Sequence, residues 1–159
     1  MPEINTKRLL APLSPASGEL APGDDGGALR GAEIEATLEL AYLMANANGD
    51  ASFDELKSFR QLAKALAPQA EVNDLLDKLS ERMHKAESFE VLVRDAAKNL
   101  PRPTAREIAY KAAYAIAVMD LETNEDERDL DDLLIEVLDL DARVGVLERD
   151  VNEALMVAD

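Results

Sequence analysis

Oxygen-bearing side chains alternate along two short stretches of the chain. The first stretch contains Asn48, Asp50, Ser52 and Asp54, and the second contains Asp120, Glu122, Asn124 and Asp126. Donors at alternate positions form the first half of a calcium-binding loop, in which oxygen atoms hold a hard cation. The pattern points to divalent-cation chemistry, with Asp120, Glu122 and Asn124 as candidate metal ligands.

The second half of the calcium-loop pattern is missing from both stretches. Glu125 stands where such a loop needs glycine, and Phe59 and Asp131 occupy the last ligand positions instead of glutamate. Helix capping explains the same residues, because a carboxylate near a helix N-terminus gains about 0.3–1 kcal/mol from the helix dipole. We therefore expect no tightly bound cofactor. A weakly bound divalent cation stays open as the alternative.

Other catalytic groups are scarce. The chain has no cysteine, and its single imidazole, His84, has no serine or aspartate arrangement that would make it a general base. His84 lies near the predicted end of a helix, where we expect a capping or surface role. The glycines do not form a phosphate-binding loop between a strand and a helix. We predict a protein that is not an enzyme, although a hydrolase with paired carboxylates stays open because nothing selects a pair.

Charge limits the classes of partner. The chain has 33 acidic and 17 basic residues, for a net charge of −16. Such a surface repels nucleic acid and anionic lipid headgroups and attracts basic protein surfaces. The lack of cysteine and of an apolar run of about 20 residues predicts a cytoplasmic protein with no segment inserted in a membrane. One basic stretch could either share a face or be scattered in solvent: Arg94, Lys98, Arg102, Arg106 and Lys111.

Helices must position the acidic stretches, because apolar residues recur at helical spacing after residue 30. No convincing strand alternation occurs, so we predict an all-α domain over 31–159 and a flexible, Pro/Gly-rich tail over 1–30. The sequences 52–55 and 124–127 match capping boxes, and Ser88 and Thr104 are predicted caps. Seven apolar stripes are expected, beginning at Ile34, Leu56, Val72, Phe89, Ile108, Leu130 and Val144.

An internal repeat relates the two acidic stretches. A shift of 72 residues places Asn48 on Asp120 and Glu55 on Glu127, and it brings Leu62 onto Leu134. Each copy reads as an Ala-rich buried helix, a short acidic turn and an amphipathic helix. The sequence therefore predicts two related helix-turn-helix units within one seven-helix bundle.

At these residues the chain resembles the TerB-like family of tellurite-resistance proteins and the related N-terminal domain of some membrane-anchored J-domain proteins. The resemblance covers about residues 31–158 and rests on two copies of an Ala-x-Ala-Asp-Gly pattern followed by Glu, at 45–55 and 117–127, and on Asn99-Leu100-Pro101. The chain departs from the pattern at Asn48, where the family has Asp, at Met119, where it has a small residue, and at Leu121, where it has Gly. The resemblance implies a seven-helix fold and a cytoplasmic role in tellurite or general stress response.

The resemblance also implies a mode of action. We expect a non-enzymatic interaction or scaffold domain with protein partners, membrane-associated ones included, and a homodimer is left open. The expected binding surface consists of the acidic turns and helix starts: Asn48, Asp50, Asp54, Glu55, Asp120, Glu122, Asp126 and Glu127. The alternative is a cation sensor in which the same turns close on a divalent ion.

Overall fold

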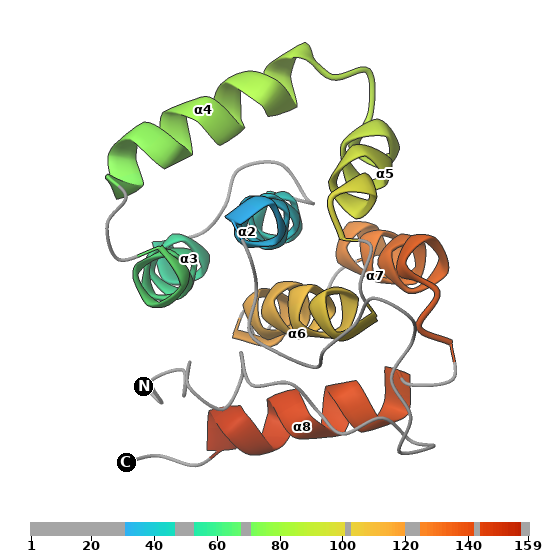
Figure 1. Cartoon of the computed structure of the whole chain (residues 1–159). Helices are drawn as coiled ribbons and strands as arrows, with labels where there is room; N and C mark the ends of the chain where they lie inside the picture. Colours follow the sequence, from blue (N-terminus) through green and yellow to red (C-terminus); the bar gives the residue numbers. More distant parts are fainter. Residues whose placement is uncertain are drawn as a thin grey trace.

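The computed structural model describes residues 31–46, 53–67, 71–100, 103–119, 125–141 and 144–156. These ranges contain α2 (Gly31–Ala45), α3 (Phe53–Leu66), α4 (Val72–Lys85), α5 (Phe89–Lys98), α6 (Pro103–Met119), α7 (Glu125–Leu138) and α8 (Val144–Met156) (Figure 1). No strand occurs in the described ranges, so the predicted all-α class is confirmed. The predicted tail, 1–30, lies outside them.

Two helices, α2 and α6, form the centre of the bundle and make its most extensive helix–helix contact. Every residue of α2 from Ala36 to Ala45 is buried, as predicted for this helix. On α6, the buried alanines allow neighbouring backbones to approach closely: Ala105, Ala109, Ala112, Ala113 and Ala115. Helices that are apolar on nearly all sides belong in an interior, which is where both lie.

The other helices cover the central pair with narrower apolar stripes. Helix α3 contacts α2 and α6, and α7 contacts α6 and α5. Figure 1 shows α4 and α8 on opposite sides of the central pair, with α4 over α2 and α8 under α6. Leu79 is the buried residue of α4, and Leu147 and Val151 are buried on α8. One buried stripe is sufficient for each outer helix because its other face meets solvent.

The repeat predicted from the sequence is present in the helix bounds. The described parts of α2, α3 and α4 begin at 31, 53 and 72, and those of α6, α7 and α8 begin at 103, 125 and 144. Helix α3 ends at Leu66 and α7 ends at Leu138, again 72 residues apart. In both copies the central helix contacts the two helices that follow it. The repeat therefore extends to a third helix, and α5 links the copies.

Local signals agree with most of the helix ends. Ser88 caps α5 as predicted, since its Oγ accepts a hydrogen bond from the Val91 N–H at 3.4 Å. The prediction that Thr104 caps α6 is wrong, because the helix already includes Pro103. Proline suits the first helical turn, where its missing N–H would have no partner within the helix.

A Schellman motif ends α7. The Leu140 N–H donates to the Ile135 carbonyl at 3.0 Å, and the Asp139 N–H donates to the Glu136 carbonyl at 3.3 Å. Asp139 adopts a left-handed conformation with φ 58°. An L-residue pays about 1–2 kcal/mol for that conformation, which glycine adopts without steric cost.

We predict that Asp139→Gly raises the free energy of unfolding by about 0.5–1 kcal/mol, since the relief of backbone strain exceeds the added entropy of the unfolded chain. Equilibrium urea unfolding measures this change. The control is Asp141→Gly, at an exposed position without a left-handed φ. It should stabilise nothing, and an equal gain in both variants would contradict the prediction.

Candidate functional site

The predicted binding surface falls mostly outside the described residues. Asn48, Asp50, Asp120, Glu122 and Asn124 all lie outside them. The backbone of Asp54 and Glu55 lies in the first turn of α3, and that of Asp126 and Glu127 lies in the first turn of α7. Their side chains are outside what the structure describes. Among the described side chains, no group of three or more His, Asp or Glu residues is arranged to hold a metal ion.

Each central helix carries a buried charge at the same position of the repeat. Glu39 on α2 is 4% exposed and Lys111 on α6 is 0% exposed. The Glu39 carboxylate lies 3.1 Å from the Arg82 guanidinium on α4, and the Lys111 ammonium lies 2.9 Å from the Asp150 carboxylate on α8. An ion pair thus joins the central helix to the outer helix in each copy, and its polarity is inverted between the copies.

The two ion pairs differ in quality. Burial raises the pKa of Glu39, the Arg82 guanidinium opposes this rise, and Asp95 on α5 adds to it. Glu39 Oε2 is close to Arg82 but is aligned for no hydrogen bond. Lys111 does donate a hydrogen bond to Asp150. The second copy therefore has the better-formed connection between its central and outer helices.

A tyrosine hydroxyl on α6 lies between two carboxyl groups. Tyr110 Oη is 2.8 Å from Asp131 Oδ1 on α7 and 2.9 Å from Glu148 Oε2 on α8. The Tyr110 side chain is fully buried, and the two acidic residues are half-buried. Tyr114, one turn along α6, stacks on the Tyr110 ring with 5.9 Å between centroids. Tyr110, Asp131 and Glu148 are named the polar cluster below, and they connect three helices at one point.

Burial sets the protonation of the polar cluster. Desolvation raises the pKa of Asp131 to about 6, the hydrogen bond from Tyr110 lowers it, and the charge of Glu148 raises it further. Burial and the two neighbouring carboxylates also raise the pKa of the Tyr110 hydroxyl. The phenol therefore keeps its proton throughout the physiological range, while Asp131 titrates within it.

The first copy of the repeat is apolar at the corresponding positions. A shift of 72 residues places Tyr110 on Leu38, Asp131 on Phe59 and Glu148 on Leu76. Phe59 is fully buried and packs edge-on against Tyr42, with ring centroids 5.6 Å apart. Tyr42 corresponds to Tyr114. One copy therefore fills this position by apolar packing, and the other fills it with three polar groups.

The basic stretch predicted from the sequence does not form one face. Arg94 and Lys98 are exposed and pair with acids on α5, whereas Lys111 is buried against α8. Arg106 donates to the Leu100 carbonyl oxygen at 2.6 Å, and Arg102 lies outside the described residues. A shared face was the wrong alternative because a helix turns about 100° per residue and Lys111 points toward the interior.

His84 agrees with its predicted surface role. The side chain is exposed near the end of α4, and its Nδ1 lies 2.7 Å from the Ser80 carbonyl oxygen of the same helix. The sequence could not select a carboxylate pair, but the structure brings Asp131 and Glu148 together. The signal that could have found them is the mismatch with Phe59 and Leu76 under the 72-residue shift.

Comparison with known proteins adds no relative: no protein-family model matches the chain, and neither does a curated protein or a solved structure. Among the helices that the structure describes, none is long and apolar enough to cross a membrane. Geometry and charge are therefore the basis for function.

We predict that Lys111→Met lowers the free energy of unfolding by about 3 kcal/mol, because it removes the buried ammonium group from beside Asp150. The control is Lys85→Met on α4. Lys85 lies closer to its partner Glu81, at 2.6 Å, but both side chains are mostly exposed, so we expect a loss below about 1 kcal/mol. Urea unfolding compares the two variants, and equal losses would show that burial of the pair does not matter.

Proposed function

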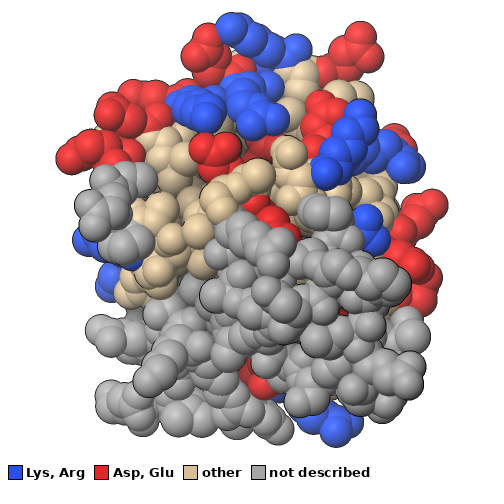
Figure 2. All heavy atoms as spheres, viewed as in Figure 1, with Lys and Arg blue, Asp and Glu red and all other residues tan. Residues whose placement is uncertain are grey.

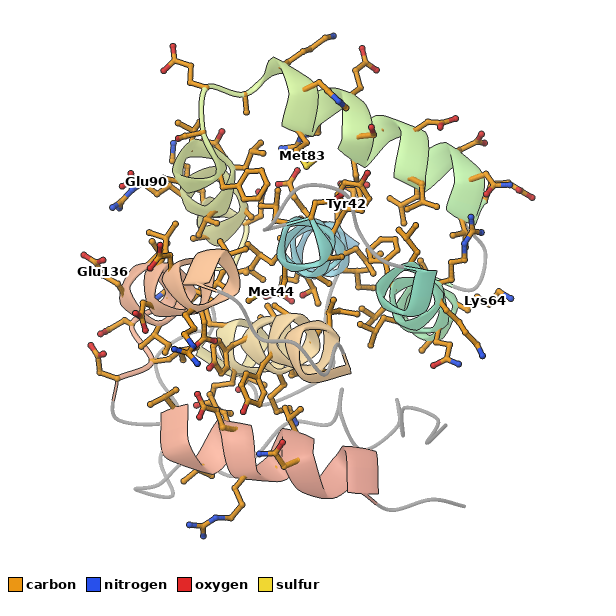
Figure 3. All side chains as sticks on the ribbon, turned by 180° about the vertical axis from the view of Figure 1, so that it is seen from behind. Tyr42, Met44, Lys64, Met83, Glu90 and Glu136 are labelled. Carbon is orange, nitrogen blue, oxygen red and sulfur yellow. The ribbon has the colours of Figure 1, made fainter. Side chains whose placement is uncertain are left out.

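We propose that the chain is a non-enzymatic interaction domain of the TerB-like kind, which binds a basic protein surface through acidic groups of its second repeat. The observation that carries the proposal is a strip of exposed carboxylates on α7, formed by Asp129, Asp132 and Glu136. Their i, i+3, i+7 spacing puts them on one face of the helix. Figure 3 shows Glu136 on the outer side of α7. These three residues are named the α7 strip.

The α7 strip differs from the other acidic surfaces because it has no ion pair with a described residue. On α4 and α5, Glu81 pairs with Lys85 and Glu90 pairs with Arg94. Figure 2 shows lysine and arginine among the acidic side chains at the top of the molecule, over α4. Negative charge on α7 is not neutralised in this way, so a cationic partner would gain more by contacting it.

The first repeat has the opposite charge on the corresponding face. Lys57, Arg60 and Lys64 are exposed on α3 at the positions equivalent to Asp129, Asp132 and Glu136. The shared fold therefore does not require acids on this face. This contrast supports a binding role for the α7 strip, which follows directly on the helix start where the second acidic turn is predicted.

The resemblance to the TerB-like family is the basis for the biological setting. We propose a cytoplasmic domain that scaffolds protein partners, membrane-associated ones included, in tellurite or general stress response. No bound cofactor is needed for this role. Calorimetric titration with calcium, magnesium, zinc and manganese separates it from the alternative of a cation sensor, which requires binding at millimolar metal or below.

We predict that the triple variant Asp129→Asn, Asp132→Asn, Glu136→Gln lowers recovery of a basic partner from the native host roughly tenfold, since three rim charges each contribute up to about 1 kcal/mol. Affinity capture at several salt concentrations measures the loss. The wild-type interaction should weaken as salt rises, because salt screens exposed charges.

The matched control is Lys57→Gln, Arg60→Gln, Lys64→Gln, which neutralises the corresponding face of α3. An effect of net charge alone would strengthen partner binding in this variant, whereas a specific role of α7 leaves binding close to that of the wild type. Equal loss in both variants, together with loss of a dimer in sedimentation, would instead identify a second copy of this chain as the partner. Unchanged recovery in the α7 variant would refute the proposal.

A further inference from the structure

The polar cluster has more hydrogen-bond contacts than its phenolic proton can make. A phenol has one proton to donate, yet Tyr110 Oη lies within hydrogen-bond distance of both Asp131 and Glu148. If both carboxyl groups are ionised, one contact places an oxygen lone pair against a negatively charged oxygen. Both contacts become hydrogen bonds only when one carboxyl group carries a proton and donates it to the phenolic oxygen.

We propose that Tyr110, Asp131 and Glu148 form a single proton-binding site, and that the bound proton fastens α8 to α6 and α7. The cluster connects these three helices, because Tyr110 belongs to α6, Asp131 to α7 and Glu148 to α8. When the proton leaves, Asp131 and Glu148 repel each other across the hydroxyl. The repulsion is relieved when α8 moves away, since α8 carries one of the two charges.

The surroundings of Asp131 favour the protonated form. Besides Glu148 on α8, Asp132 on its own helix adds negative charge, and burial adds the largest effect. No described charge on α2 or α5 is among the groups that shift it. On α6, Tyr114 is an uncharged neighbour whose own pKa is raised by burial. Lys111 on α6 and Asp150 on α8 pair with each other next to the cluster.

The direction of the pH effect follows from the raised pKa of Asp131. In the unfolded chain an aspartate titrates near pH 4, whereas in the folded protein Asp131 titrates at about 6. The folded state therefore binds more protons between these two values, and stability decreases as pH rises through this window. Attachment of α8 is strongest below about pH 4 and is lost progressively as pH passes about 6. The effect is independent of whether the α7 strip binds a partner.

Hydrogen exchange on the full chain tests the proposal. Protection factors of α8 amides, corrected for intrinsic exchange and divided by those of α2, should fall roughly tenfold or more between pH 5 and pH 7.5. In Asp131→Asn the uncharged amide keeps a partner for Tyr110, so the ratio should not change with pH. The control Asp132→Asn, at the exposed neighbouring position, should keep the wild-type pH dependence.

A second measurement does not depend on the stability of a variant. Carbon-13 NMR of the side-chain carboxyl groups in the wild type should show one resonance of the cluster titrating near pH 6, well above ordinary aspartates. If Asp131→Asn does not fold, Glu148→Gln is analysed in the same way. Titration of Asp131 at its ordinary pH, a constant α8 ratio in the wild type, or a wild-type pH response in Asp131→Asn would each overturn the proposal.

Discussion

The contact between α2 and α6 is the constraint on which the rest of the structure depends. Both helices are enclosed, and the alanines of α6 let α2 approach closely. Since neither helix keeps a solvent-exposed face of its own, each outer helix needs only one apolar stripe to join the bundle. This arrangement also means that a polar group on α2 or α6 must find its partner on a neighbouring helix, because water is not available to it.

The inverted ion pairs follow from that constraint and distinguish the two copies. Glu39 meets Arg82 of α4, and Lys111 meets Asp150 of α8. If α4 and α8 exchanged places, Lys111 would meet the cationic side of α4 and Glu39 would meet the acidic side of α8. Like charges in contact at a buried position are unfavourable by several kcal/mol. The charges therefore select the correct outer helix for each central helix in a chain whose two halves have similar apolar patterns.

Much of the fold could be predicted because apolar periodicity reports which side of a helix is buried. The stripe that begins at Val72 and the cap at Ser88 are examples. Buried polar residues give no such signal. Lys111 looked like one more member of a basic stretch, and Asp131 looked only like a poor calcium ligand. Their roles depend on contacts with Asp150 and Glu148, which lie on another helix and are not specified by local spacing.

The comparison of Phe59 with Asp131 shows what the second copy gives up. A buried aromatic ring contributes apolar burial and an edge-on contact at this position. A half-buried carboxyl group loses hydration there and recovers only part of it through Tyr110. The position can therefore be filled at lower cost, as the first copy demonstrates. It follows that the second copy, with α8, is the half of the bundle whose stability depends on a titrating group, while the first copy has an apolar core at the corresponding position.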